Sequence, residues 1–292
     1  GQNWITSVKN QTYNCGSCWA FSAIATIEAM MNIYYNNYNI DLDLSEQEIV
    51  SCTQYCSCSG GYNDDALSRI LYYGVTNESC FPYSASNEAC SNKCSLPSYT
   101  VAIQSIDVVS SYSEADIKDA LINIGPIASG VNNTGIHHDM ALVGYKQLIA
   151  GDVIRYVIDD GGIDSTIEAG NPLIGQTYWI FKNSYGTSWN GGGTGGYFYA
   201  FFQTISQIGA AGISYTAEIP SSTISYSRNC TDNDNDGYYW WGTGSKPSTC
   251  PACGSSMCGS CPTTTCATGF CCSCATYRTT PPAPCRSGRI SA

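Results

Sequence analysis

The sequence predicts an α+β protein with a helical N-terminal lobe and a β-rich C-terminal lobe, followed by a small disulfide-rich module. Apolar residues first repeat about every 3.6 positions, and short β-rich runs begin only near residue 99. Helices that precede strands in this way are typical of α+β folds. Ten of the 18 cysteines then crowd into positions 230–285. We expect a main domain over 1–220 and a Cys-rich extension over 221–292.

Composition excludes some classes of partner. The formal net charge is −11, which argues against nucleic acid, because binding phosphates requires Lys and Arg. Eighteen cysteines in 292 residues indicate an oxidising compartment. The longest charge-free run, 197–217, is interrupted by Gln203, Ser206, Gln207 and glycines. It is therefore expected to form strands rather than a membrane span.

Glycosylation signals fit the secretory route. Sequons at Asn77, Asn132 and Asn229 predict N-glycans, whereas the sequon at Asn10 adjoins the candidate site and is expected to be unused. No signal peptide is visible and the chain does not begin with Met, which indicates a processed form. We expect a secreted, extracellular, lysosomal or vacuolar location.

The first predicted helix begins at Cys18 and runs to about residue 35. Gly16 and Ser17 form the turn before it. A cysteine in the first turn of a helix lies near unpaired N–H groups and the positive end of the dipole, which favour the thiolate. Such a placement suits a nucleophile.

Residues 23–80 are predicted to be mostly helical. Ser45 is expected to cap a second helix, with Glu48 at the third helical position as in a capping box. The pair Gly60–Gly61 follows, which is either a simple turn or a place where backbone approaches a ligand. Strands are predicted at 101–103, 153–158, 178–181 and 197–202, and a linker at 221–229. The module after it has too few aliphatic residues for a core and needs cross-links.

A nucleophilic thiol needs a base, and histidine is the usual one near neutral pH. The chain has two histidines, His137 and His138, which are adjacent and precede the apolar run 140–143. A histidine is more often a structural residue than a catalytic one, but here the choice is confined to one dipeptide. The catalytic base is therefore expected at His137 or His138.

Several blocks of the sequence resemble the papain-like cysteine peptidases of the papain and cathepsin type. Cys15-Gly16-Ser17-Cys18-Trp19 matches their C-G-[SA]-C-[WY] signature. Five further blocks follow the order of the family, over roughly the first 220 residues: 8–11, 44–48, 58–62, 138–145 and 181–189. The resemblance implies the two-lobed papain-like fold and a cysteine endopeptidase that acts on proteins or peptides through a thiolate–imidazolium pair and a thioester, without a cofactor for catalysis.

The resemblance also implies residue roles. Cys18 would be the nucleophile and His138 the general base and acid, with His137 where the family more often has Asn or Asp. Asn183 would orient the imidazole, although a buried structural Asn is the alternative. Gln11 would join the Cys18 backbone N–H in stabilising the oxyanion.

Substrate-binding residues follow from the same resemblance. Gly60 and Gly61 would hydrogen-bond an extended substrate backbone, and Trp189 would shield the His–Asn pair. Asp139 replaces a small or apolar residue typical of the family. If it points into the main specificity pocket, it would favour a basic side chain.

The sequence departs from the family pattern in several places. Gln11 lies seven residues before Cys18, one more than is usual, and Tyr185 stands where the family usually has tryptophan. His138 and Asn183 follow Cys18 by 120 and 165 residues, outside the usual spacing of roughly 130–150. The stretch 126–138 is shortened and 146–176 carries an insertion. Substrate preference therefore does not follow from the resemblance.

Cysteine pairing is implied in part. The resemblance pairs Cys15 with Cys58 and Cys52 with Cys90, and a third pair of Cys80 with Cys94 is left open. Cys56 remains over. It is free, or alters this pairing, or bonds to the extension or another chain.

Three alternatives concern metals and redox chemistry. The Cys15–Cys18 spacing also suits thiol–disulfide exchange, but no βαβ pattern precedes it. Zinc is an alternative to disulfides in the extension, at Cys250, Cys253, Cys258 and Cys261. Asp232, Asp234 and Asp236 precede Gly237 as in a short calcium loop, and the competing interpretation is a solvated acidic turn.

A rival function remains open for the whole chain. The altered cleft, the odd cysteine and the Tyr- and Cys-rich extension would also suit a protease-fold protein of weak or no activity. Its role would be structural assembly, including self-assembly through the extension, or extracellular binding.

Overall fold

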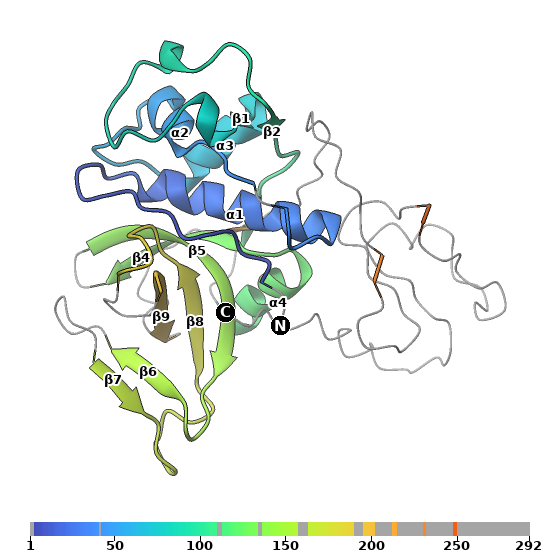
Figure 1. Cartoon of the computed structure of the whole chain (residues 1–292). Helices are drawn as coiled ribbons and strands as arrows, with labels where there is room; N and C mark the ends of the chain where they lie inside the picture. The colour runs from blue at the N-terminus through green and yellow to red at the C-terminus, as the bar shows by residue number, and fades with distance from the viewer. Residues whose placement is uncertain are drawn as a thin grey trace. The chain divides into compact units, whose positions relative to one another are not determined.

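The computed structural model describes residues 3–40, 42–109, 113–133, 136–156, 163–189, 195–201, 212–214, 230–231 and 248–249. Contacts divide the chain into two units, each described by itself. The larger unit is Ile5–Met30 with Leu42–Thr223, and the smaller is Gly1–Trp4, Met31–Asp41 and Ile224–Ala292. Figure 1 shows that the larger unit has helices on one side and a β-sheet on the other.

Three helices make up the helical side: α1 (Cys18–Tyr35), α2 (Glu46–Cys52) and α3 (Asn63–Tyr73). The first turns of α1 lie between the other two helices and the sheet (Figure 1). Trp19, Ile24 and Ile27 are at most 1% exposed, as expected for a helix that is apolar on most of its faces. The predicted helix from 18 to about 35 is confirmed.

The Ser45 cap of α2 is also confirmed. Its hydroxyl accepts a hydrogen bond from the Glu48 backbone N–H at 2.9 Å. The Glu48 carboxylate does not complete the capping box. It accepts instead from Thr76 and forms ion pairs with Arg69 and Lys93. Glu48 thereby connects α2 to the strand and loops behind it.

The sheet has six antiparallel strands among the described residues, in the order β3 (Asp107–Val109), β10 (Gly212–Ser214), β4 (Ile127–Asn133), β5 (Ile136–Gln147), β8 (Thr177–Lys182), β9 (Tyr197–Phe201). β5, which carries His138, lies between β4 and β8, and Asn183 directly follows β8. Helix α4 (Glu114–Asn123) packs on this sheet. The hydrophobic core between α4 and the sheet contains Ile117, Ala120, Ile127, Met140, Leu142, Trp179, Phe181 and Phe198.

Smaller elements complete the larger unit. They are β1 (Val75–Thr76), η1 (Glu78–Cys80), η2 (Cys90–Asn92), β2 (Thr100–Val101), β6 (Val153–Tyr156) and β7 (Ile163–Thr166). β6 and β7 form a hairpin within the expected insertion 146–176. The prediction that 23–80 is mostly helical was too broad, because long loops, β1 and η1 occupy much of it. The predicted strand at 101–103 is a two-residue pair with β1.

Three disulfides cross-link the helical side: Cys15–Cys58, Cys52–Cys90 and Cys80–Cys94. The first two are the pairs that the family resemblance implies, and the third is the pair that it left open. Cys18 and Cys56 are free thiols. Of the three alternatives for Cys56, the structure therefore shows a free residue, whose thiol lies 3.4 Å from an Asp65 carboxylate oxygen.

In the smaller unit, Asn36 donates a side-chain hydrogen bond to Thr231, and Trp4 packs edge-on against Tyr38. Cys230 is disulfide-bonded. The predicted calcium ligands Asp232, Asp234 and Asp236 lie outside the described residues. So do the glycan site Asn229 and the four cysteines of the zinc alternative.

The described residues contain neither a membrane-spanning helix nor a grouped set of metal ligands. None of their helices is long and apolar enough to cross a membrane. No group of His, Cys, Asp or Glu side chains among them is arranged to hold a metal ion. The predicted glycan acceptor Asn77 is only 4% exposed, and its amide oxygen accepts from the backbone of Ser98 and Tyr99. That burial disfavours a glycan at Asn77.

Different structural constraints require glycine at positions 60 and 61. Gly60 has a φ of 125°, which side-chain-bearing residues rarely adopt, and its N–H and C=O both pair with Ser57. A Cβ at Gly61 would lie 2.5 Å from the Trp19 indole. The loop therefore packs directly on the first turn of α1.

We expect Gly61→Ala to destabilise the protein by about 1–3 kcal/mol, because the added methyl group overlaps the buried Trp19 ring. Gly144→Ala is the matched control, since its nearest neighbour would be 4.0 Å away. Urea unfolding followed by tryptophan fluorescence measures both. Equal midpoints for the two variants would contradict the packing argument.

Candidate active site

The imidazole of His138 is anchored by Asn183. His138 Nε2 lies 2.7 Å from Asn183 Oδ1, and this oxygen also accepts from the Ser184 backbone N–H. Because a carbonyl oxygen only accepts, Nε2 carries the proton and Nδ1 is the nitrogen left for proton exchange. Asn183 is 3% exposed, and its amide nitrogen has no partner among the described residues. The pair joins β5 to the end of β8.

Cys18 lies at the start of α1 with its sulfur turned toward β5. The backbone N–H groups of Asp139, which follows His138 in sequence, of Trp19 and of Cys18 itself lie near this sulfur. Burial, and then the Asp139 charge, raise the pKa of the thiol to about 11, while the three N–H groups lower it. Burial also lowers the pKa of His138, and the Asn183 hydrogen bond raises it. Both groups are therefore biased toward their uncharged forms.

Tyr185 covers the other side of the imidazole. Its ring stacks on His138, with centroids 4.6 Å apart and planes at 16°, and its hydroxyl lies 3.2 Å from His138 Nδ1. Trp189 contacts the Tyr185 ring edge-on and packs on the sheet core. The position that the family usually fills with tryptophan thus holds a polar aromatic residue.

Gln11 is buried beside the start of α1. Its backbone N–H donates to the Ser184 carbonyl at 2.7 Å, and its side-chain oxygen accepts from the Ser184 hydroxyl. The side-chain amide nitrogen donates to the Cys15 carbonyl at 3.1 Å. An amide nitrogen has two hydrogens, so one remains for a further acceptor.

Gly61 offers backbone hydrogen-bonding groups. Gly60 uses its own N–H and C=O on Ser57. Within the part of the chain that the structure describes, the N–H and C=O of Gly61 have no partner. They are therefore available to an extended peptide, which pairs through such groups.

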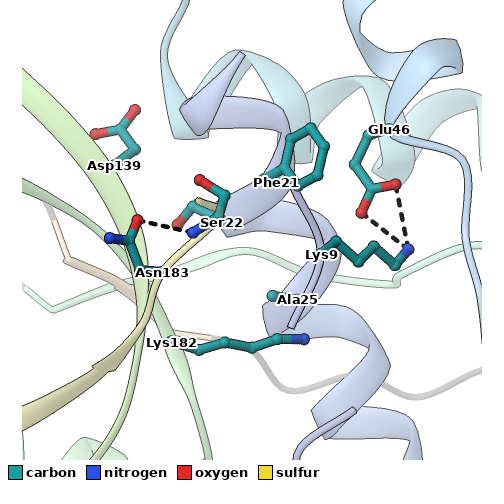
Figure 2. A pocket seen from close by; sticks show the side chains of 9 residues that line it. Lys9, Phe21, Ser22, Ala25, Glu46, Asp139, Lys182 and Asn183 are labelled. Atoms are coloured by element: carbon teal, nitrogen blue, oxygen red, sulfur yellow. Dashed lines mark hydrogen bonds and ion pairs between the residues drawn. The ribbon is translucent and has the colours of Figure 1, made fainter. Parts of the chain in front are cut away.

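Asp139 lies next to a small pocket between α1 and the sheet (Figure 2). The pocket is lined by Lys9, Phe21, Ser22, Ala25, Glu46, Asp139, Lys182, Asn183 and Ser184. The Asp139 carboxylate also lies against Gly130 of β4, where a Cβ would be 2.9 Å from its oxygen. Burial, and then the charge of Asp64 on α3, raise the pKa of Asp139 to about 7.

Comparison with known proteins identifies the family. The model of the family described as "Papain family cysteine protease" matches residues 1–218. The chain belongs to this family. Among curated relatives, the viral cathepsin of Autographa californica nuclear polyhedrosis virus is 32% identical over 230 residues, covering 77% of this chain and 62% of the relative. The senescence-specific cysteine protease SAG12 of Arabidopsis thaliana is also 32% identical, over 219 residues. The chain spans less than two thirds of the length of these relatives.

Solved structures agree with this membership. The bromelain protease of Ananas comosus, in complex with the E64 inhibitor, matches with 27% identity and a TM-score of 0.55, covering 75% of this chain and all of that one. Digestive procathepsin L2 of Tenebrio molitor matches with 26% identity and a TM-score of 0.54, covering 74% of this chain and 65% of that one. The papain-like fold expected from the sequence is confirmed.

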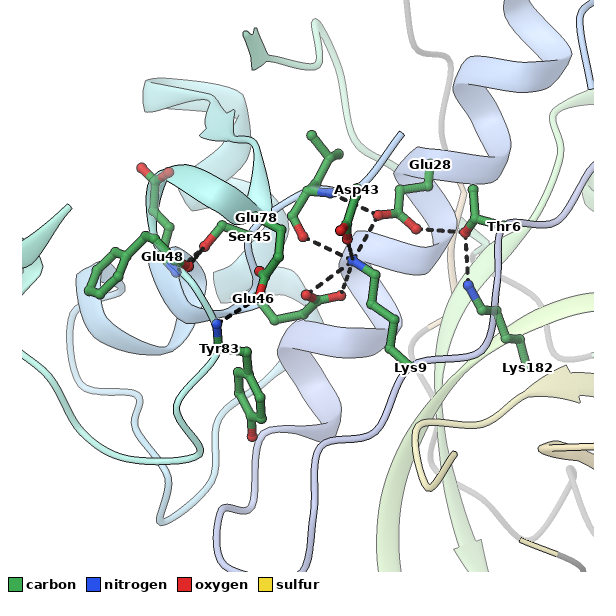
Figure 3. Close-up of polar contacts among 12 residues, drawn as sticks. Thr6, Lys9, Glu28, Asp43, Ser45, Glu46, Glu48, Glu78, Tyr83 and Lys182 are labelled. Atoms are coloured by element: carbon green, nitrogen blue, oxygen red, sulfur yellow. Dashed lines mark hydrogen bonds and ion pairs between the residues drawn. The ribbon is translucent and has the colours of Figure 1, made fainter. Parts of the chain in front are cut away.

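A buried charge cluster lies behind the papain-like site (Figure 3). Lys9 Nζ pairs with Glu28 at 3.0 Å, Asp43 at 2.8 Å and Glu46 at 2.9 Å. The Glu28 and Glu46 side chains are at most 2% exposed. Lys182, one residue before Asn183, donates to Thr6, which donates to Glu28. The cluster thereby connects the segment before α1 to α1, α2 and β8.

Sequence reasoning missed several supporting residues. The Tyr83 hydroxyl donates to the Gln11 carbonyl and lies 2.7 Å from the Ser17 hydroxyl, so it braces the turn before Cys18. Tyr83 stands in no recognisable motif. Ser184 and Lys182 do lie inside the matched block 181–189, but residue type alone does not reveal their partners.

We expect Lys9→Met to lower the free energy of unfolding by about 3 kcal/mol or more, because it leaves the buried Glu28 and Glu46 charges without their partner. Lys146→Met breaks the more exposed Lys146–Asp152 pair and should cost less than about 1 kcal/mol. Urea titrations of both variants test the difference. A loss at Lys9 no larger than that at Lys146 would show that the cluster is not needed for stability.

Proposed function

We propose that this chain is a cysteine endopeptidase with Cys18 as nucleophile, His138 as general base and acid, Asn183 as orienter and Gln11 as oxyanion donor. The observation that carries the proposal is the hydrogen bond from His138 Nε2 to Asn183 Oδ1 at 2.7 Å, together with a free Cys18 thiol whose pKa is lowered by the backbone N–H of Asp139, the residue after His138. Membership of the papain family supports it.

The chemistry follows from these positions. The Cys18 proton passes to His138 Nδ1, and the thiolate attacks the carbonyl carbon of the scissile bond. The resulting oxyanion accepts from the Cys18 backbone N–H, which begins α1, and from the remaining hydrogen of the Gln11 amide. Imidazolium then protonates the leaving amine, which leaves a thioester. Water attacks the thioester, loses a proton to His138 and releases the acid product.

Substrate-binding roles extend the proposal. Gly61 would hydrogen-bond the substrate backbone, while Gly60 holds the loop through its bridge to Ser57. Trp189 would shield the His–Asn pair through its contact with Tyr185. Asp139 would favour a basic substrate side chain.

We also propose a cellular location, glycan acceptors, a calcium site and self-assembly for this chain. Family membership and the three disulfides support a secreted, lysosomal or vacuolar location. Asn132 and Asn229 remain the proposed glycan acceptors. Calcium binding at Asp232, Asp234 and Asp236, and self-assembly through the extension, rest on the sequence alone.

Two observations favour the second candidate, a protease-fold protein of low activity used for assembly or binding. The thiol pKa is raised to about 11, and His138 Nδ1 already has a hydroxyl partner in Tyr185. Both features oppose formation of the ion pair. The rate of covalent labelling separates the two candidates.

An epoxide inhibitor selective for thiol peptidases should add one equivalent of mass to the whole chain. Cys18→Ala should abolish the added mass, whereas Cys56→Ala, which removes the other described free thiol, should retain it. Intact-mass spectrometry gives the result. Absence of labelling in the wild type over hours, or labelling that persists in Cys18→Ala, would contradict the peptidase proposal.

We expect preference for Lys and Arg over neutral residues to rise between pH 5 and pH 8. The pKa of Asp139 is raised to about 7, so its carboxylate is largely protonated at pH 5 and charged at pH 8. Peptide libraries assayed at both pH values measure the preference. Asp139→Asn should remove both the preference and its pH dependence, and a variant that keeps them would place the basic-side-chain site elsewhere.

A further inference from the structure

We propose that Tyr185 is a positioning residue whose hydroxyl contacts His138 Nδ1 and opposes its protonation by the Cys18 thiol. The proposal rests on the function proposed above for Cys18 and His138. Asn183 holds Nε2, so both ring nitrogens of the resting imidazole have a partner: an amide oxygen on one side and a phenol on the other.

The geometry fixes the phenol over the imidazole. The two rings are stacked at 4.6 Å and 16°, and the hydroxyl lies 3.2 Å from Nδ1. Tyr13 stacks on Tyr185 at 5.9 Å and 26°, and Trp189 contacts it edge-on at 5.8 Å. These contacts confine the Tyr185 ring, so its hydroxyl stays near the nitrogen that must exchange protons.

The backbone confines the same residue. Tyr185 forms an antiparallel bridge with Asn10, and the next N–H, that of Gly186, donates to the Lys9 carbonyl at 3.0 Å. The segment before α1 therefore carries Gln11 and holds Tyr185 at once. The placement of the hydroxyl is a property of the packed site and not of one side-chain rotamer.

The positions of the protons on His138 and Tyr185 determine which form of the imidazole the hydroxyl stabilises. Nε2 donates to Asn183, so Nδ1 of the neutral imidazole carries no proton, and the Tyr185 hydroxyl, which lies over the stacked ring, can donate toward it. Burial raises the pKa of Tyr185 to about 12, so the phenol keeps its proton. The N–H of a protonated Nδ1 would point along the imidazole plane, away from the stacked hydroxyl, so protonation removes this contact without replacing it. The hydroxyl thus stabilises the neutral imidazole and opposes transfer of the Cys18 proton.

Several titratable groups lie near the His138 ring. Cys18 faces this region from α1, Asp139 follows His138 on β5, and Tyr13 lies behind Tyr185. A tryptophan, usual in the family at this position, has no hydroxyl to donate. We infer that this chain restrains its ion pair by a group that the usual residue lacks.

The test uses the full chain with Tyr185→Phe, which keeps the stacked ring and removes the hydroxyl. Alkylation of Cys18 by iodoacetamide at pH 6 reports the thiolate, in a Cys56→Ala background so that the other described free thiol does not contribute. We expect the rate constant to rise about fivefold, because loss of one hydrogen bond to neutral Nδ1 favours the imidazolium. Imidazole NMR in a His137→Asn background, which leaves one histidine, should show a matching rise in the His138 pKa.

Tyr72→Phe is the matched control, because Tyr72 is 76% exposed on α3, and it should change neither readout. Tyr185→Trp is a second variant without the hydroxyl and should reproduce the increase if Tyr185→Phe folds poorly. Unchanged alkylation and titration in the folded variants would overturn the proposal. Neither readout requires peptide cleavage. If the alkylation rate and the His138 pKa change as expected but the chain cleaves no peptide, the proposed function is contradicted and the role of Tyr185 is not.

Discussion

The ion cluster around Lys9 is the constraint on which the site depends. Three carboxylates converge on one ammonium group, and two of them are almost fully buried. Buried charges are tolerated only when they are paired, so the segment that carries Lys9 has essentially one position against α1 and α2. Because Gln11 follows two residues later and bonds to Ser184, the same constraint sets where this segment meets the end of β8.

The site is assembled from two sides by different forces. On the helical side, disulfides and the packing of Gly61 on Trp19 hold the turn before Cys18. On the sheet side, antiparallel pairing of β5 with β8 brings His138 and Asn183 together although 45 residues separate them. Burial then biases thiol and imidazole toward neutrality, and the N–H groups around the sulfur act in the opposite direction. The balance of these effects, rather than the residue types alone, determines reactivity.

Much of this could be predicted from the sequence because the informative signals are local. The apolar repeat specified α1, a Ser–Glu spacing specified the Ser45 cap, and ordered blocks placed His138 beside Asn183. The Lys9 cluster could not be predicted, since its partners lie 19 to 37 residues away along the chain and no periodicity relates them. The hydroxyl of Tyr185 was likewise hidden. The sequence shows only that Tyr replaces the usual Trp and predicts weaker shielding, whereas the fold shows that the hydroxyl lies 3.2 Å from Nδ1.

The additional residue between Gln11 and Cys18 illustrates how such a fold absorbs a departure from its family. Thr12 has a φ of 62°, a left-handed conformation that costs a non-glycine residue on the order of 1 kcal/mol or more. Local hydrogen bonds stabilise it: its N–H donates to Asn10, and its hydroxyl accepts from the Asn14 N–H. The strain is confined to this turn because both ends are fixed, Gln11 by Ser184 and Cys15 by its disulfide. The Gln11 side chain consequently still reaches the Cys15 carbonyl, and a spacing that looks too long in the sequence leaves the proposed oxyanion donor beside the first turn of α1.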